Sequence, residues 1–190
     1  LVVCSDKTRF WDLSTGQLRE LNGARYGCIS HDGRTLAIST GGHIVELWDI
    51  QAVERRCRLI APTHRTVGPI AFSPNDRTLA VGCRHQGDLT LWDARTGQIA
   101  FTYETATIGG LAATTFSPCG QYLLASNRSK PGQIVQWSVS SQQSRKANGQ
   151  ASATASLGTT VEGHGNETLS YNVAFVPRPE AGSGSIHSFR

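Results

Sequence analysis

Alternating apolar and polar residues, broken by short polar turns, run along most of this chain. In the segment 89–92, "LTLW", two leucines alternate with a threonine and Trp92. Successive side chains of a strand point to opposite faces, so we expect the leucines and Trp92 on opposite faces of one strand. Val45 and Leu47 stand in the same places before Trp48. The pattern predicts an all-β chain built from short strands.

The strand pattern repeats along the chain. The tryptophans that end one strand of each repeat are separated by 37, 44 and 45 residues: Trp11, Trp48, Trp92 and Trp137. Each of the last three follows a serine by 18 to 20 residues: Ser30, Ser73 and Ser117. A leucine precedes the same tryptophans by 12 to 14 residues: Leu36, Leu79 and Leu123. Landmarks that keep step across three units indicate an internal repeat.

Each repeat has the pattern of four strands. The first strand ends at the serine, and a tight turn such as 74–77, "PNDR", follows it. The next segment, 78–83, is nearly continuous in small and apolar residues, which is typical of a strand covered on both faces. The third strand ends at the Trp-Asp pair, 93–97 turns the chain, and 98–104 alternates as a fourth, more exposed strand. A single such sheet leaves its faces uncovered, whereas repeated sheets cover them by stacking radially.

The combination of "FSP-x-D/G-R-x-LA" with "L-x-LWD" at a period of 40-odd residues resembles the WD40 repeat family, over residues 1 to 138 directly. The resemblance implies a β-propeller of four-stranded antiparallel blades. We expect a partial ring within residues 1–178, with about three full blades and partial blades at each end: 1–22 (partial), 24–61, 65–104, 108–162 and 164–178 (partial). Residues 179–190 stay unassigned. Proteins that resemble this pattern close with about seven blades, so the remaining blades are expected to be missing from this chain.

The resemblance assigns a structural role to twelve residues of the repeat motif: Trp11, Asp12, Ser30, Trp48, Asp49, Ser73, Trp92, Asp93, Ser117, Trp137, Gly163 and His164. WD40 repeats commonly carry an aspartate six residues before the tryptophan, in a hydrogen-bonded set that joins serine and tryptophan. That position holds Gly42, Gln86 and Pro131 here. We therefore expect the set to be incomplete in every full unit.

Charge is spread along the chain. The formal net charge is +4, and the densest basic group is Arg55, Arg56 and Arg58. Without interleaved aromatic residues this group indicates a solvated outer strand rather than a nucleic-acid site. We therefore expect no nucleic-acid partner.

Five cysteines stand far apart and form no CxxC pair. Their number and spacing argue against a disulfide framework or a zinc site and favour a reducing, cytoplasmic compartment. No run approaches the roughly 18 apolar residues that a membrane-spanning helix needs, so no membrane partner is expected.

Motifs of catalysis are absent from the sequence. It contains no GxSxG elbow, HExxH helix, P-loop or kinase signature, and its six histidines show no metal-ligand spacing. We expect no enzyme activity, cofactor or metal in this chain, although a flanking catalytic domain stays possible. The polar insert 139–154 is interpreted as a tolerated surface loop, with a docking or regulated segment as the alternative.

Function is expected in the loops at one end of the sheets, because loops on a rigid scaffold commonly carry recognition. The candidate partner-binding residues on this rim are Arg25, Tyr26, His43, His64, Arg65, Arg84, His85 and Arg128. Arginine and tyrosine are enriched in binding hot spots, so the hypothesis is a rim that binds an acidic peptide or protein. Simple solvation of these loops is the alternative interpretation.

Three classes of function follow. The first is a non-catalytic protein–protein interaction scaffold of the WD40 type, which we prefer. The second is a sensor or regulatory portion of a larger kinase or NTPase. The third, a propeller enzyme with chemistry in its central channel, ranks last because the inner strands "GCIS", "IAFS" and "ATTFS" offer no acidic or histidine cluster.

Overall fold

The chain is built from antiparallel β-sheets. The computed structural model describes residues 2–4, 7–11, 16, 18–22, 26–61, 66–103, 109–130, 133–139, 172–176 and 185–189. Sixteen strands lie within these ranges: β1 (Val2–Cys4), β2 (Lys7–Trp11), β3 (Leu18–Asn22), β4 (Tyr26–Ile29), β5 (Thr35–Ser39), β6 (Ile44–Asp49), β7 (Glu54–Ile60), β8 (Val67–Phe72), β9 (Thr78–Cys83), β10 (Leu89–Asp93), β11 (Ile99–Tyr103), β12 (Leu111–Phe116), β13 (Tyr122–Asn127), β14 (Ile134–Ser138), β15 (Asn172–Val176) and β16 (Ser185–Phe189).

These strands form five sheets in chain order: sheet A (β1–β3), sheet B (β4–β7), sheet C (β8–β11), sheet D (β12–β14) and sheet E (β15–β16). Within each sheet, every strand pairs with the next one along the chain, always antiparallel. The pairing of the third and fourth strands shifts register before Trp48 in sheet B and before Trp92 in sheet C. The same irregularity at the same repeat position shows that the sequence repeat is also a structural repeat.

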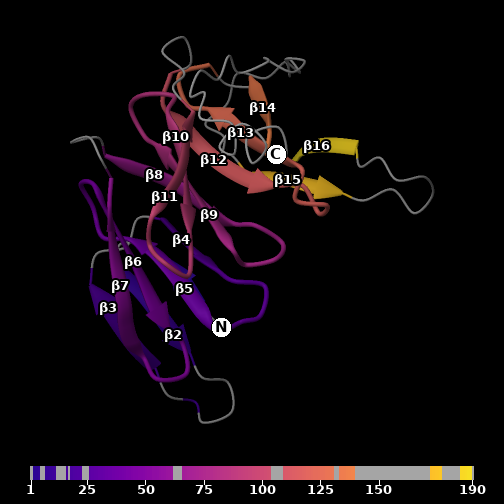
Figure 1. The fold of residues 1–190 in the computed structure, drawn as a ribbon. Helices are drawn as coiled ribbons and strands as arrows, with labels where there is room; N and C mark the ends of the chain where they lie inside the picture. The colour runs from indigo at the N-terminus through magenta and orange to yellow at the C-terminus, as the bar shows by residue number, and fades with distance from the viewer. Residues whose placement is uncertain are drawn as a thin grey trace.

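Sheets B to E follow one another in space as they do in the chain. Strand β8 lies against β4 on one side and β12 on the other, and β12 lies against β15. The first strands of four consecutive sheets are therefore neighbours. Figure 1 shows this succession as a change of colour from the purple strands of sheet B to the yellow hairpin β15–β16.

Antiparallel pairing places the connections at two opposite ends. The loop end carries the β5–β6, β9–β10 and β13–β14 loops (residues 40–43, 84–88 and 128–133). The turn end carries the β4–β5, β8–β9 and β12–β13 turns (residues 30–34, 73–77 and 117–121). These two names are kept below.

Apolar side chains fill the spaces between consecutive sheets. Leu89 and Leu91 belong to the core between sheets C and D, whereas Trp92 belongs to the core between sheets B and C. The prediction of opposite faces is confirmed. The second strands are buried over nearly their whole length, as a strand covered on both faces requires: β5, β9 and β13.

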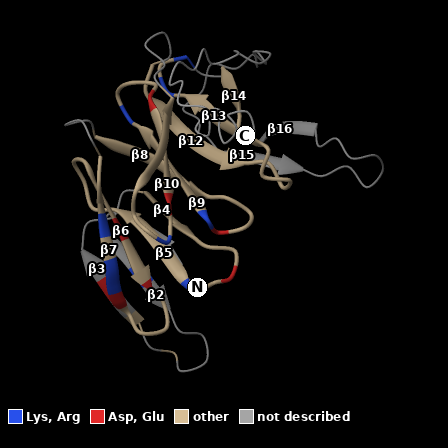
Figure 2. Ribbon diagram, in the orientation of Figure 1, with Lys and Arg blue, Asp and Glu red and all other residues tan. Residues whose placement is uncertain are grey.

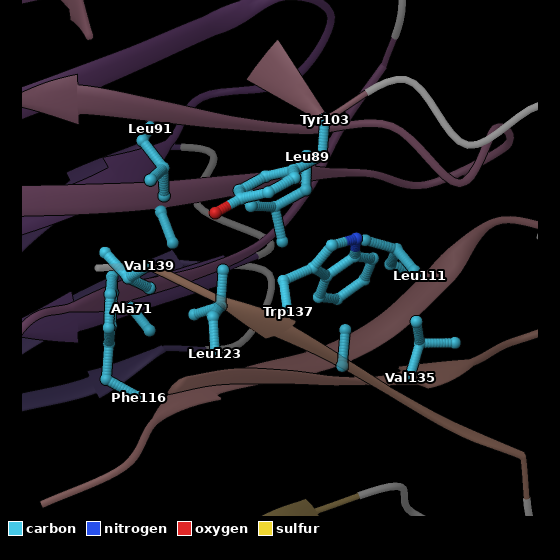
Figure 3. Packing of buried hydrophobic residues seen from close by; sticks show 12 residues of the cluster. Ala71, Leu89, Leu91, Tyr103, Leu111, Phe116, Leu123, Val135, Trp137 and Val139 are labelled. Carbon is cyan, nitrogen blue, oxygen red and sulfur yellow. The ribbon is translucent and has the colours of Figure 1, made fainter. Parts of the chain in front are cut away.

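Trp137 shows how tightly these layers pack. Its side chain is 1% exposed, and its ring lies 5.7 Å from that of Tyr103 in sheet C. Figure 3 shows the Trp137 indole beside Leu89 and Tyr103. Burial raises the pKa of Tyr103 to about 12, and its hydroxyl donates to the Ser138 carbonyl at 3.2 Å. The last residue of the outer strand of sheet C is thus locked to sheet D.

Two predictions concern the C-terminal part. The segment 164–178, expected to form a partial blade, contains β15, and β16 in the unassigned stretch pairs with it. The insert 139–154 lies outside the described residues except for its first, Val139, which is buried in the core between sheets C and D.

Candidate functional site

Backbone hydrogen bonds join the connections at the loop end into one continuous structure. Within sheet C, the Arg84 N–H donates to the Thr66 carbonyl at 3.0 Å, and within sheet D the Arg128 N–H donates to the Gly110 carbonyl at 2.6 Å. Between sheets B and C, the Val67 N–H donates to the Gly42 carbonyl at 2.7 Å. These bonds hold the loops in fixed relative positions.

Two glycines join sheets C and D at this end. Gly109 forms an isolated β-bridge with Gln86 of the β9–β10 loop. A Cβ atom at Gly110 would overlap the backbone oxygen of Arg84 and lie 3.0 Å from the His85 Cα atom. A Cβ atom at Gly109 would overlap the Ser129 side chain. Only glycine allows this approach, and we call Gly109 and Gly110 the glycine seam.

Asn127 organises the β13–β14 loop beside the seam. The residue is fully buried, and its amide donates to the Gln133 side chain at 2.7 Å. Its amide oxygen accepts the backbone N–H groups of Ser129 at 2.8 Å and Lys130 at 3.3 Å. A buried side chain with three hydrogen bonds of this kind stiffens the residues that it bonds. Arg128 therefore lies in a segment that is fixed by these bonds.

Five of the eight predicted rim residues lie in the described part, all at the loop end: Tyr26, His43, Arg84, His85 and Arg128. Tyr26 is half-buried and packs on the core between sheets B and C. The His43 carbonyl accepts the Ala61 N–H at 2.9 Å. The remaining three lie outside the described residues: Arg25, His64 and Arg65.

The seam brings together the loops of Arg84 and Arg128. Arg128 and its neighbour Lys130 are exposed, whereas Arg84 is partly buried. The Arg84 Nε atom is buried and has no hydrogen-bond partner among the residues that the structure describes. A buried guanidinium N–H without an acceptor is costly, and a carboxylate is the acceptor that matches its geometry. The loop end therefore offers donors suited to an acidic group.

The repeat-motif serines act at the opposite end. Each buried hydroxyl accepts the backbone N–H five residues later, at 2.9 to 3.0 Å. The same hydroxyl contacts the side chain two residues later, which is Asp32 at 2.6 Å, Asn75 at 2.8 Å and the Cys119 thiol at 3.2 Å. The serines thus stabilise their own turns. Asp49 and Asp93 do the same in the next reversal, where each accepts two backbone N–H groups.

The tryptophans make no bond to these serines. In the described part of the chain, the buried indole N–H groups of Trp92 and Trp137 have no partner, and that of Trp48 donates to Glu46 at 3.1 Å. No described serine of the motif is joined to its tryptophan, in agreement with the incomplete set expected from the sequence. The backbones of Gly42 and Gln86 instead join neighbouring sheets. Asp12, Gly163 and His164 lie outside the described residues, and the side chain of Trp11 is not described.

The basic strand β7 has a structural role. Figure 2 shows it as the most strongly blue of the described strands. Arg55 and Arg58 bond the buried Glu46 carboxylate at 3.1 and 2.8 Å, while their side chains stay 42% and 53% exposed. Arg56 is exposed and donates to the Thr35 hydroxyl at 3.3 Å. The predicted outer, solvated strand is confirmed, and two of its arginines also neutralise a buried carboxylate.

A second carboxylate, that of Asp76, links sheets B and C at the turn end. Asp76 accepts the backbone N–H groups of His31 at 2.7 Å and Asp32 at 3.0 Å, and it lies 3.1 Å from the His31 Nδ1 atom. We call this contact the Asp76 clasp. His31 lies in the β4–β5 turn at this end.

A search of the described residues finds no group of three His, Cys, Asp or Glu side chains that could hold a metal ion. Nor does any helix in that part of the chain have the length and apolarity to span a bilayer. The thiols of Cys57, Cys83 and Cys119 are not in disulfides.

Sequence reasoning did not identify the glycine seam, Asn127 or the Asp76 clasp as parts of these contacts. A paired glycine directly before an inner strand is the signal that could have indicated the seam. Asp76 carried no such signal, because its partners lie 44 and 45 residues earlier in the chain.

Comparison with known proteins adds no assignment. No family model matches the chain, and no curated protein matches it.

Proposed function

We propose that this chain forms part of a WD40-type β-propeller and serves as a non-catalytic protein–protein interaction scaffold that binds an acidic segment at its loop end. Three features support the propeller: the repeat period, the consecutive four-stranded sheets B and C, and the side-by-side first strands β4, β8 and β12. Radial stacking of such sheets about an axis has this arrangement. The thiols of Cys57, Cys83 and Cys119, which are not in disulfides, support a cytoplasmic setting.

One observation carries the binding proposal. The glycine seam holds the loops of Arg84 and Arg128 together, and the buried Arg84 Nε atom has no acceptor in the described part of the chain. Loops that are already ordered lose little entropy on binding, so their donors contribute to affinity rather than to ordering. An Asp or Glu side chain of a partner would supply the missing acceptor once the Arg84 side chain turns outward.

The test is a charge reversal with a matched control. Peptides selected from a displayed library of random 12-residue sequences should be acidic, and their affinity is measured by fluorescence anisotropy. The double variant R84E/R128E should bind about tenfold or more weakly, a loss of about 1.4 kcal/mol. The control R77E/R95E makes the same charge change on two exposed arginines of the opposite end. Equal loss in both variants, or selected peptides without net negative charge, would refute the proposal.

A further inference from the structure

A pocket of about 230 Å³ lies between sheets C and D at the turn end. Its walls include Pro74 and Asn75 from the β8–β9 turn and Phe116, Cys119 and Gly120 from β12 and the turn after it. Apolar and polar groups share this lining. The pocket lies at the end opposite to Arg84 and Arg128, so its role is independent of the function proposed above.

The repeat shows what occupies the same place one interface earlier. Asp76 stands three residues after Ser73, and Gly120 stands three residues after Ser117. Both have positive φ angles, 57° and 70°, in the left-handed region. Asp76 reaches back to the turn of sheet B and closes the gap between sheets. Gly120 has no side chain with which to reach the turn of sheet C.

The sheet C turn keeps part of the anion-binding arrangement. In sheet B, the carboxylate of Asp76 accepts the N–H groups of His31 and Asp32. The corresponding residues in sheet C are Pro74, which has no N–H, and Asn75. The Asn75 N–H donates no hydrogen bond among the residues that the structure describes. Sheet C therefore has one N–H at the two positions where sheet B has two.

The space near Gly120 is sufficient for an added group. A Cβ atom at Gly120 would lie 3.6 Å from the Pro74 Cδ atom, which is ordinary van der Waals contact. The buried Phe116 and Val139 add apolar walls beside this position. A carboxylate carried by a small apolar group matches both the donor and the walls.

We propose that this pocket binds a carboxylate of a peptide partner, in the place that the Asp76 carboxylate occupies between sheets B and C. The Asn75 N–H donates to the carboxylate, and Phe116 and Val139 contact the apolar part of the same residue. The carboxylate comes either from the C-terminus of the partner or from a Glu side chain.

Cys119 provides the measurement, because its exposed thiol lines the pocket. The probes are acetyl-Ala-Leu with a free C-terminus, the same peptide amidated, and acetyl-Glu-amide. Modification of Cys119 by a disulfide reagent, followed by peptide mass spectrometry, should slow in proportion to 1 + [L]/Kd, about fivefold at four times Kd. The free-acid peptide should protect if the C-terminus is the source, and acetyl-Glu-amide if the side chain is.

Two variants complete the test. Gly120→Asp supplies an internal carboxylate at a position whose φ an aspartate already adopts in Asp76, so it should abolish protection by either probe. Gly33→Asp makes the same change at the equivalent turn position of sheet B, where a Cβ atom would meet nothing within 4 Å, and should leave protection intact. Equal protection by the amidated peptide in the wild-type protein overturns the proposal without any variant. Undiminished protection in a folded Gly120→Asp protein overturns it as well.

Discussion

Sheets B and C are joined at the turn end by a charged side chain, whereas sheets C and D are joined most closely at the loop end by two residues without side chains. The Asp76 clasp spans the first interface through three contacts of 2.7 to 3.1 Å. At the second interface the glycine seam brings backbones together, and the turn end contains a pocket. At the turn end, the two interfaces have different residues at the same repeat position, Asp76 and Gly120.

The difference teaches how a repeat protein gains a site. Each interface has an apolar layer of its own. Sheet D has Gly120 where sheet C has Asp76, and the pocket at this position leaves the core between sheets C and D in place. Stability in such stacks depends on each sheet and its contacts with its neighbours. The residues at the turn end of one interface can therefore change while the neighbouring interface keeps its hydrogen bonds.

The largest effect is expected at the glycine seam. Gly110→Ala should destabilise the protein by about 3 kcal/mol, because the new Cβ atom would overlap the Arg84 backbone oxygen and a backbone atom cannot rotate away. Urea unfolding should show a lower midpoint. Gly33→Ala is the control, since a Cβ atom there meets nothing and only the positive φ is strained, at a cost of about 1–2 kcal/mol. Equal midpoints for the two variants would show that the seam tolerates a side chain.

A smaller effect is expected at the clasp. Asp76→Gly keeps the backbone conformation and removes the carboxylate, whose side chain is 21% exposed, so the loss should be about 1 kcal/mol. Hydrogen exchange should accelerate at the His31 and Asp32 amides and stay unchanged at the Gly120 turn.

The variant Asp76→Asn removes one of the two acceptor oxygens of this residue and keeps the other. Asparagine also tolerates a positive φ but presents only one acceptor oxygen. In the Asp76→Asn protein, the amide hydrogens of His31 and Asp32 should exchange at rates between those of the wild type and the Asp76→Gly variant. Wild-type exchange in Asp76→Gly would mean that the clasp contributes nothing to closure.

The smallest effect is expected in the pH dependence of alkylation of one cysteine from each interface. Cys57 packs at the interface of sheets B and C, and burial raises its pKa above the ordinary 9.0. The Ser117 hydroxyl and the Gln121 N–H stabilise the Cys119 thiolate and lower its pKa below 9.0. Alkylation requires the thiolate, so the rate of Cys119 should reach half its maximum below pH 9.0 and that of Cys57 above it. Mass spectrometry of the two alkylated peptides across pH shows which thiol reacts at the lower pH. The Ser117→Ala variant should raise the pKa of Cys119, because it removes the hydroxyl that stabilises the thiolate.

Much of the sheet architecture could be predicted from local patterns. Alternation placed Leu89 and Leu91 opposite Trp92, and the continuous run 78–83 indicated a strand buried on both faces. Loop positions such as Arg84 and Arg128 followed from counting strands, because successive connections of an antiparallel sheet alternate between its ends.

The contacts between sheets could not be predicted in the same way. The seam depends on how closely the Arg84 backbone approaches Gly110, which the packing of two sheets determines. The clasp depends on a non-glycine residue with a positive φ and on partners in another repeat. Gly42 and Gln86 stand where WD40 repeats commonly have an aspartate, which predicted that the hydrogen-bonded set of serine and tryptophan side chains is incomplete. The sequence did not reveal that the backbones of these two residues bond the neighbouring sheet.

The unbonded indoles of Trp92 and Trp137 give the molecule an optical consequence. An excited indole lowers its emission energy as nearby polar groups reorient around it. In sheets C and D the two N–H groups lie buried without a partner in the described structure, whereas the Trp48 N–H in sheet B is held by a carboxylate. Trp48 therefore occupies an electrostatically different site from Trp92 and Trp137. Single-tryptophan versions of the chain would give sheet B an emission colour different from that of sheets C and D, so that light could report whether sheet B opens before them.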